Sequence, residues 1–365
     1  MKAKLVVAIV IALTAAGTAA AKMPEPVSVS LHTGTVVQEE RSDLYHLSLY
    51  PRFDVGSAYA VVGANLYFDD EFRLHDRGND VLVLETVGYA RRGFEAFYGD
   101  IEGLTFGRGF IVRNYYSNTM SNVPDNEQKG IVVNRWTDRA GLGLFGTLSH
   151  LFGGRAERRM GRVEVGATVV SDSDPDFRVW GLDAAYSPRS ELQLYAEGGL
   201  IEDYGTGSAA GVKLKLLQGM TFMIEFRKFD ADFVPGIVDE HYEARPVFET
   251  IANNPSGRID GYLTQLILFE GTSHPVTVSY EDYEAADPRL TFMTTLGLSE
   301  RLAFRLYFAQ QNFTTEAALD RNSVARGELL VGIGRRLDVI VDYYRAYDDA
   351  GAPLESVGLH AKLHL

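Results

Sequence analysis

The chain has 365 residues, of which 46% are hydrophobic, and its length fits either two ordinary soluble domains or one large β domain. It contains no cysteine, which excludes disulfides, cysteine-ligated zinc, thiol nucleophiles, iron–sulfur clusters and a lipid anchor on cysteine. The formal net charge of −14 argues against nucleic acid as a partner, because a polyanion would be repelled.

The first 21 residues have the organisation of a secretory signal peptide. Lys2 and Lys4 precede an apolar stretch over residues 5–13, and small residues then lead to Ala21. This order predicts cleavage after Ala21. A transmembrane anchor is the alternative, but its apolar core would need about 20 residues. We therefore expect residues 22–365 to form the secreted protein, as a single domain.

From residue 26 onward a two-residue alternation recurs, and no long stretch follows the 3.6-residue period of a helix. In residues 191–202, for example, Leu192 and Leu194 alternate with Gln193 and Tyr195. The content of 36 Gly, 19 Tyr and 20 Phe also favours β structure. We predict about 18 strands, within a range of about 16 to 20, over approximate spans 26–38, 43–53, 57–68, 80–90, 93–101, 139–150, 160–171, 177–187, 191–202, 206–217, 220–230, 258–270, 275–284, 288–298, 302–314, 325–334, 337–346 and 355–365.

Short and long connections alternate along these spans. Pro188-Arg189 and Gln218-Gly219 are short, whereas residues 69–79 and 231–257 form long polar connections. A soluble β-sandwich or solenoid and a transmembrane β-barrel can both use such strands. The barrel is favoured because strands of about 10 residues match a tilted membrane crossing, the connections alternate in length, and the polar face carries many charges. The expected fold class is therefore all-β, an antiparallel transmembrane β-barrel closed by the C-terminal strand.

The chain ends on the alternating sequence SVGLHAKLHL, residues 356–365. Because a barrel has no free edge only if its last strand is held, we expect this strand to pair with the first, near residues 26–38. On this pattern the chain resembles a Gram-negative outer-membrane β-barrel of the porin type. The resemblance implies an assembly signal in the last strand, formed by Gly358, Leu359, Ala361, Leu363 and Leu365. Leu365 departs from the terminal aromatic residue that is usual in that class.

The same resemblance implies a location in the cell outer membrane after the signal peptide is removed. Its implied partners are outer-membrane lipid and lipopolysaccharide, the barrel-assembly machinery and, as one alternative, further copies of the chain in a homotrimer. Nucleic acid is not among the expected partners, and no cofactor is expected.

Residues 102–138 carry more apolar and aromatic side chains than a bare loop should. Gly107 and Gly109 would permit a sharp bend. Since porins commonly fold one long loop into the lumen, the resemblance implies a pore constriction formed by Arg108, Arg113, Asn114, Tyr115 and Tyr116. The alternative is that residues 102–113 and 130–137 are two further strands, which would bring the count to about 20.

The polar faces of the predicted strands carry both signs of charge. The expected lumen-lining residues are Arg162, Glu164, Glu197, Lys213, Lys215, Glu225, Arg227, Arg305, Asp338 and Asp342. A barrel of this strand number leaves a water-filled channel, and such a mixed lining predicts weak selectivity. The alternative for any single charge is that it pairs with a neighbouring strand and lies satisfied against the wall.

Three motifs that could signal chemistry are weak here. The glycine string of residues 205–211 lacks the following helix of a nucleotide site, so a hairpin tip is expected. The sequence DSDPD at residues 172–176 lacks the remaining ligands of a calcium loop, so a solvated acidic loop is expected. Ser149 and His150 are adjacent and would face opposite ways on a strand. We therefore predict no catalytic or metal-binding residues.

The function expected from the sequence is passive diffusion of small hydrophilic solutes through a weakly selective outer-membrane channel. The alternative is a barrel that does not conduct, acting as an adhesin or as a structural, surface-binding protein.

Overall fold

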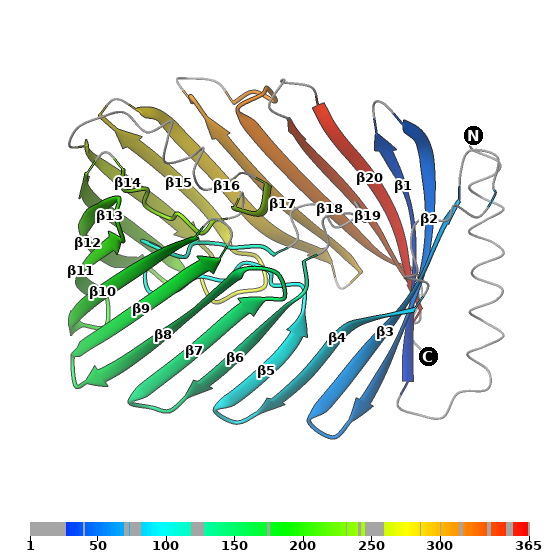
Figure 1. The fold of residues 1–365 in the computed structure, drawn as a ribbon, viewed down its shortest axis with the longest axis horizontal. Coiled ribbons are helices and arrows are strands. Elements are labelled where there is room, and N and C mark those ends of the chain that lie inside the picture. The colour runs from blue at the N-terminus through cyan, green and yellow to red at the C-terminus, as the bar shows by residue number, and fades with distance from the viewer. Residues whose placement is uncertain are drawn as a thin grey trace. The chain divides into compact units, whose positions relative to one another are not determined.

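The computed structural model describes residues 27–38, 41–68, 73, 82–117, 128–173, 176–230, 232–239, 242–244, 259–284, 286–299, 301–313, 317–333, 337–347 and 353–363. The predicted signal peptide and Leu365 lie outside these residues. Across the described ranges, twenty strands hydrogen-bond into one sheet (Figure 1). The expectation of an all-β antiparallel protein is confirmed. No helix among these residues is long and apolar enough to cross a membrane.

The strands are β1 (Val27–Gln38), β2 (Arg41–Val55), β3 (Ala58–Phe68), β4 (Leu82–Arg91), β5 (Phe94–Gly99), β6 (Gly130–Trp136), β7 (Ala140–Thr147), β8 (Leu151–Met160), β9 (Val163–Ser173), β10 (Asp176–Arg189), β11 (Leu192–Ile201), β12 (Gly205–Leu217), β13 (Met220–Phe229), β14 (Ile259–Leu268), β15 (Val276–Tyr283), β16 (Ala286–Ser299), β17 (Leu302–Gln311), β18 (Ser323–Ile333), β19 (Leu337–Tyr347) and β20 (Pro353–Leu363). A single 3₁₀ turn, η2 (Tyr242–Ala244), lies among the described loops.

The chain divides into two compact units. Unit 1 comprises residues 1–89, 293–308 and 318–365, and unit 2 comprises residues 90–292 and 309–317. In unit 1, β18, β19, β20, β1, β2, β3 and β4 pair in that order, each antiparallel to the next. The predicted pairing of the last strand with the first is thus confirmed. Val29 lies opposite Leu363, and Thr33 lies opposite Leu359.

In unit 2, strands β5 to β15 pair consecutively and antiparallel, as hairpins do. Strand β10 shows how their two faces differ. Trp180 and Leu182 are 47% and 71% exposed, whereas Phe177 and Val179, which point the other way, are buried. We call the face of Trp180 the bare face of unit 2, and the opposite one, on which loop segments lie, the packed face.

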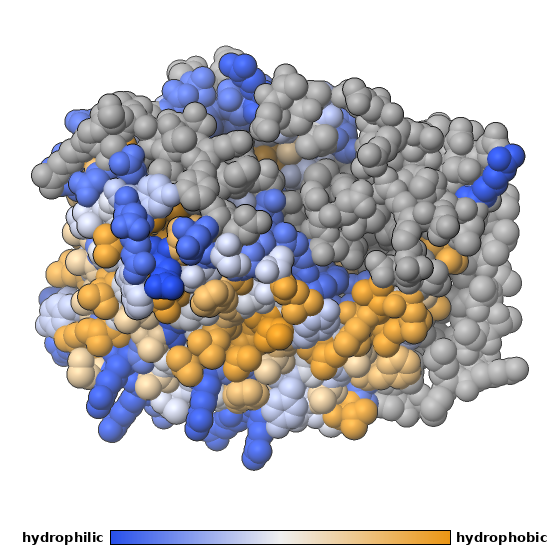
Figure 2. All heavy atoms as spheres, viewed as in Figure 1, coloured by the Kyte–Doolittle hydropathy of each residue, from blue (hydrophilic) through white to orange (hydrophobic). Residues whose placement is uncertain are grey.

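The bare face is apolar although it is exposed. Large hydrophobic side chains stand open along it, namely Leu142, Leu144, Phe152, Trp180, Leu182, Tyr186, Leu194, Leu200 and Phe226. Figure 2 shows this face over strands β5 to β9. Hydrophobic residues, in orange, gather along the strands, and hydrophilic side chains, in blue, project at the edge formed by the short turns. The packed face instead buries charged residues, including Arg155, Glu197, Glu225 and Arg227. Hydrophobic residues such as Phe177 and Val179 are buried beside them, so the packed face holds a mixed core. The unusual feature is the bare face, because a water-soluble sheet protein leaves a polar face exposed.

Two covering segments lie on the packed face: residues 100–117, and residues 232–244, of which 240 and 241 lie outside the described residues. Backbone hydrogen bonds fold the first segment back on itself between Leu104 and Tyr115. The bend uses Gly107 and Gly109, at φ of 63° and 88°, as their sequence positions suggested. A parallel bridge between Val112 and Val238 joins the two segments.

Aromatic side chains anchor both segments to the wall. Phe110 stacks on Phe233 with ring centroids 5.2 Å apart, and Phe233 is fully buried. A Cβ added at Gly207 on β12 would meet the Phe233 ring, and so would one at Gly199 on β11. The glycine string of residues 205–211 was therefore wrongly interpreted as a hairpin tip. It lies inside β12, where its missing side chains make room for these rings.

All eighteen predicted spans overlap observed strands, and two observed strands were missed. Strand β6 lies within the stretch of residues 102–138, so the alternative of further strands is right for 130–136 and wrong for 102–113. Strand β8, LFGGRAERRM, was not anticipated because its glycine pair and four charges hide the alternation. The predicted span 139–150 also runs too far, since β7 ends at Thr147.

Candidate functional site

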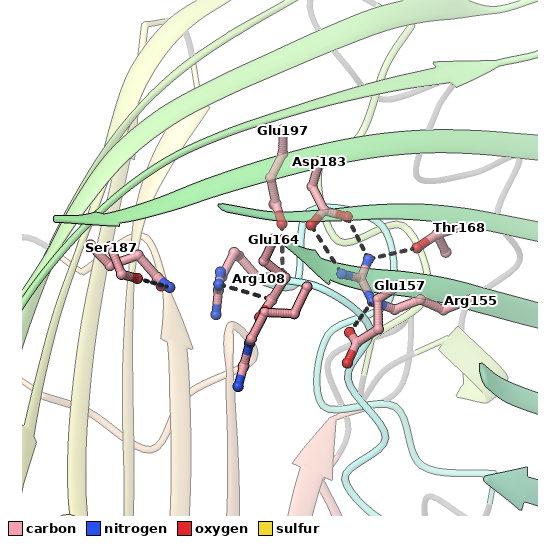
Figure 3. A network of polar contacts seen from close by, with 10 residues as sticks. Arg108, Arg155, Glu157, Glu164, Thr168, Asp183, Ser187 and Glu197 are labelled. Atoms are coloured by element: carbon pink, nitrogen blue, oxygen red, sulfur yellow. Dashed lines mark hydrogen bonds and ion pairs between the residues drawn. The ribbon is translucent and has the colours of Figure 1, made fainter. Parts of the chain in front are cut away.

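The packed face of unit 2 carries a network of paired charges between the wall strands and the covering segments. Figure 3 shows one part of it, around Arg155 on β8. The Arg155 guanidinium donates to both carboxylate oxygens of Asp183 on β10, at 2.5 and 3.0 Å. It also donates to Thr168 on β9 at 3.3 Å and to Glu157 at 3.2 Å. Such a two-point contact fixes the guanidinium in one orientation.

Arg108 ties the tip of the first covering segment to the same wall (Figure 3). Its backbone N–H donates to Glu197 at 2.7 Å, and its guanidinium lies 3.4 Å from Glu164. The Glu164 carboxylate also accepts a hydrogen bond from the Arg159 guanidinium at 3.0 Å. About a fifth of the Arg108 side chain, 22%, stays exposed, so its charge remains open to water on one side.

Arg113 holds the returning arm of the segment to a second group of charges. Its guanidinium lies 2.5 Å from Glu281 on β15. The other Glu281 oxygen accepts hydrogen bonds from the Arg227 guanidinium at 3.2 Å and from the Tyr283 hydroxyl at 2.8 Å. Arg227 also donates to Glu225, its neighbour two residues back on β13. A buried arginine between two carboxylates is neutralised where it lies, so the wall tolerates it.

The second covering segment is attached through acidic side chains, whereas the first uses arginines. Asp239 lies 3.5 Å from Arg289 on β16, and Glu243 lies 3.5 Å from Nε2 of His150. Nδ1 of His150 faces the Asp172 carboxylate at 2.8 and 2.9 Å. The two segments thus contribute opposite charges, and each finds its complement on the wall.

Two tyrosines complete the contacts around His150. The Tyr242 hydroxyl donates to Asp172, and the Tyr115 hydroxyl donates to Glu243 at 2.5 Å. Burial and the nearby Glu243 carboxylate raise the pKa of the Tyr115 hydroxyl, and burial with Asp172 does the same for the pKa of Tyr242. Both hydroxyls therefore stay protonated and keep donating. Burial also raises the pKa of Glu243 above its ordinary value. We call Tyr115, His150, Asp172, Tyr242 and Glu243 the histidine clasp.

The five residues expected at the constriction all belong to the first covering segment, but they face different surroundings. Arg108 and Arg113 pair with wall acids as described, and both keep part of their surface open. Asn114 takes a positive φ of 52°, which helps the chain turn, and it is half-buried, as is Tyr116. Tyr115 is fully buried, so it supports the segment and is closed to solutes.

The expected lumen-lining residues divide in the same way. Four of them, Glu164, Glu197, Glu225 and Arg227, lie in the network on the packed face. Lys213 points to the same face and lies 3.3 Å from Glu270 of the β14–β15 turn. Arg162 stands exposed in the β8–β9 turn, and Lys215 is exposed near the end of β12. In unit 1, Arg305 lies 3.2 Å from Glu328, while Asp338 and Asp342 are half-buried on β19.

Sequence reasoning missed two parts of the network. Arg155 escaped it because β8 was not expected. Asp172 was expected in a solvated loop, yet it is fully buried at the end of β9, because Tyr242 and His150 both bind it. His150 lies in the turn after β7, so its adjacent Ser149 bonds instead to Gln128 at 2.7 Å. The described residues include no group of three or more acidic, histidine or cysteine side chains that could hold a metal ion.

Comparison with known proteins yields structural likeness only. No protein-family model matches the chain, and no curated protein matches it in sequence. Among solved structures, the outer-membrane protein OpdK of Pseudomonas aeruginosa has a TM-score of 0.42 at 11% identity, over 93% of this chain and 98% of that one. OpdO of the same organism has a TM-score of 0.43 at 9% identity, over 93% and 95%. OccAB3 of Acinetobacter baumannii has a TM-score of 0.39 at 10% identity, over 93% and 98%.

Proposed function

We propose that the chain is an outer-membrane β-barrel channel through which small hydrophilic solutes diffuse passively. The observation that carries the proposal is the bare face of unit 2, which is apolar although it is exposed, while charged side chains are buried on the packed face beside the hydrophobic core. An apolar outer face can contact the hydrocarbon of a bilayer, and in a barrel each strand is hydrogen-bonded to its neighbours so that no edge stays free. The pairing of β20 with β1 supplies such a tie between the ends of the chain.

In this proposal the covering segments lie in the lumen and narrow it. Arg108 and Arg113 present partly exposed charges there, each beside carboxylates of the wall. A solute would pass a mixed set of fixed charges with no net attraction for one ion sign, so selectivity is weak. The channel performs no chemistry, and it needs no cofactor.

The test is electrical. Protein refolded in detergent and added to a planar bilayer should give stepwise conductance, and its electrophoretic mobility should change on boiling. Folded, inserted protein that gives no conductance steps would contradict the channel. Protein that stays in solution without detergent would contradict the membrane barrel itself.

A plugged barrel that acts in adhesion or surface binding is the second candidate. It is favoured by how tightly the covering segments are held: Tyr115, Phe233 and Val238 are fully buried, and Arg113 is paired with Glu281. This candidate predicts negligible conductance for the intact protein. Deleting residues 103–129 should then open the pore, whereas in a conducting channel the same deletion only enlarges steps that already exist.

A further inference from the structure

Three arginines stand among apolar side chains at the short-turn end of the bare face of unit 2. Arg135 lies near the end of β6, Arg158 near the end of β8, and Arg189 at the end of β10. All three are exposed. Each strand ends there in a short turn, so the three arginines lie at the same edge of the sheet. Other charged side chains of this face, such as Arg178 and Lys228, lie toward its opposite end, where they pair with Glu202 and Asp260.

Strand register places these arginines on the apolar face. Directly opposite residues of an antiparallel pair point to the same side. Arg135 lies opposite Leu142, and Arg189 lies opposite Leu192. Arg158 lies opposite Ala140 on one side and Val165 on the other. Their directly opposite neighbours are therefore apolar, and within the described part of the chain their guanidinium groups form no ion pair. The Glu191 carboxylate of the turn after β10 lies near Arg189 without pairing with it.

A guanidinium on a lipid-facing surface needs an anionic partner or water. Near the boundary of the hydrocarbon layer its long stem can lie along apolar neighbours while the charge reaches the head groups. Phosphate matches the guanidinium fork, which can donate two parallel hydrogen bonds to it. The side chains projecting below the apolar band of Figure 2 lie at this short-turn edge.

We propose that Arg135, Arg158 and Arg189 form a binding girdle for the phosphates of anionic phospholipids, in the leaflet that borders the short turns. The inference rests on the proposed membrane barrel. The girdle fixes the depth of the barrel in the bilayer and gives it a preference for membranes rich in negatively charged head groups. Other arginines of the same edge, such as Arg92, Arg139 and Arg162, are exposed and lie in the turns themselves, outside the strands.

The test compares two triple variants of equal charge. One is Arg135→Gln, Arg158→Gln and Arg189→Gln; the control is Arg92→Gln, Arg139→Gln and Arg162→Gln. Each protein is folded into vesicles of phosphatidylcholine alone, and into vesicles with a quarter of phosphatidylglycerol. The temperature at which heat-modifiable migration is lost is measured in both, together with the phosphatidylglycerol retained per protein after extraction in mild detergent.

We expect phosphatidylglycerol to raise the transition temperature of the wild type and of the control by several degrees. The bare-face variant should lose this rise and retain at most half as much of the lipid. Equal behaviour of both triple variants would overturn the girdle, as would a wild type that is indifferent to phosphatidylglycerol. A third measurement is sedimentation of the protein with peptidoglycan. If the bare-face variant loses this sedimentation while its lipid retention is unchanged, the girdle is overturned and the three arginines bind the cell wall. Failure of the wild type to insert into either vesicle would instead contradict the membrane barrel.

Discussion

At the scale of single residues, the packed face shows why buried charges must be matched. Arg155 and Asp183 leave only 8% and 9% of their side chains exposed, and they make two hydrogen bonds to each other. Removing one partner leaves the other charge buried without compensation, which typically costs about 3–5 kcal/mol. An exposed pair such as Arg52 and Asp54, at 45% and 40%, is typically worth less than about 1 kcal/mol.

Arg155→Ala should therefore lower the free energy of unfolding by about 3–5 kcal/mol, and Arg52→Ala by less than about 1 kcal/mol. Urea titration of the protein in vesicles measures both. The double variant Arg155→Met, Asp183→Leu should recover most of the loss, because neither charge of this pair then stays buried without its partner. If Arg155→Ala is no worse than Arg52→Ala, the pair is solvated and the packed face is wetter than its burial indicates.

The histidine clasp makes the second covering segment sensitive to pH. Burial raises the pKa of Glu243 above the value of about 4.3 found in unfolded chains. A carboxyl whose folded pKa is raised stabilises the fold fully below its unfolded pKa, and this stability is lost as pH rises through the folded pKa. The groups facing Glu243 are the Tyr115 hydroxyl and the His150 ring, with Asp172 behind them.

Attachment of η2 should thus weaken as pH rises from about 4 upward. The protection factor of the Tyr242 amide, which bonds to the Asp239 carbonyl at 3.2 Å, should fall over that range. Glu243→Gln keeps an oxygen that accepts from the Tyr115 hydroxyl but removes the carboxyl group that titrates. In this variant the protection factor of the Tyr242 amide should therefore stay constant with pH. His150→Gln removes the imidazole that faces Glu243 and serves as the second variant. A fall that disappears in His150→Gln and persists in Glu243→Gln would contradict the assignment to Glu243.

These residues also show where sequence reasoning ends. Glu164, Glu197, Glu225 and Arg227 were expected on the polar face because alternation alone assigns faces to a strand. Alternation says nothing about which charge meets which, since pairing depends on strand register and on loops far apart in the chain. The meeting of His150 with Asp172 and Glu243 depends on both, so no local pattern announced it.

At the scale of elements, the covering segments depend on small residues in the wall. Gly199 and Gly207 lie opposite each other on β11 and β12, and together they receive the Phe233 ring. A Cβ at Gly207 would clash with that ring, so the ring must move. Gly327 on β18 has ordinary extended backbone and nothing within 4 Å of the same added atom, which makes it a matched control.

Gly207→Ala should loosen the second covering segment while Gly327→Ala leaves it in place. We expect residues 232–239 to be cleaved several-fold faster by added protease in Gly207→Ala, and single-channel steps to become larger or noisier. Unchanged cleavage in Gly207→Ala would show that Phe233 is not what anchors the segment. The strand itself should persist in both variants, because each keeps its backbone hydrogen bonds.

The strands were predictable where their two faces differ, and they were lost where they do not. Strand β11 is an example of such a difference, since Leu192, Leu194 and Leu200 stand on the bare face while Gln193 and Glu197 point to the other. Strand β8 places Arg158 on the bare face and Arg155 on the packed face, so charge appears on both sides and the alternation vanishes. Strand β6 was obscured for another reason: it follows the long first covering segment, whose apolar residues belong to packing on the wall.

At the scale of the whole molecule, the ends of the chain carry the most specific expectation. Strand β20 lies between β19 and β1, and its alternate residues from Leu359 to Leu363 lie opposite apolar residues on β19 and opposite Thr33, Leu31 and Val29 on β1. Leu359 is opposite Val341 and Thr33, and Leu363 is opposite Leu337 and Val29. If this seam closes a barrel, these two leucines face lipid, and an acidic side chain there opposes both insertion and pairing.

Leu359→Asp and Leu363→Asp should each impair assembly, whereas His364→Ser should be tolerated because its side chain belongs to the polar alternation. The measurement is the folded, heat-modifiable fraction recovered after refolding into vesicles at a fixed time. We expect that fraction to fall several-fold for both aspartate variants and to stay near the wild-type value for His364→Ser. Lys362, opposite Asp338, supplies a further control, since Lys362→Gln changes the charge on the other face of the same strand. Equal recovery of all four variants would mean that β20 is not a membrane seam and that its pairing with β1 serves a sheet in water.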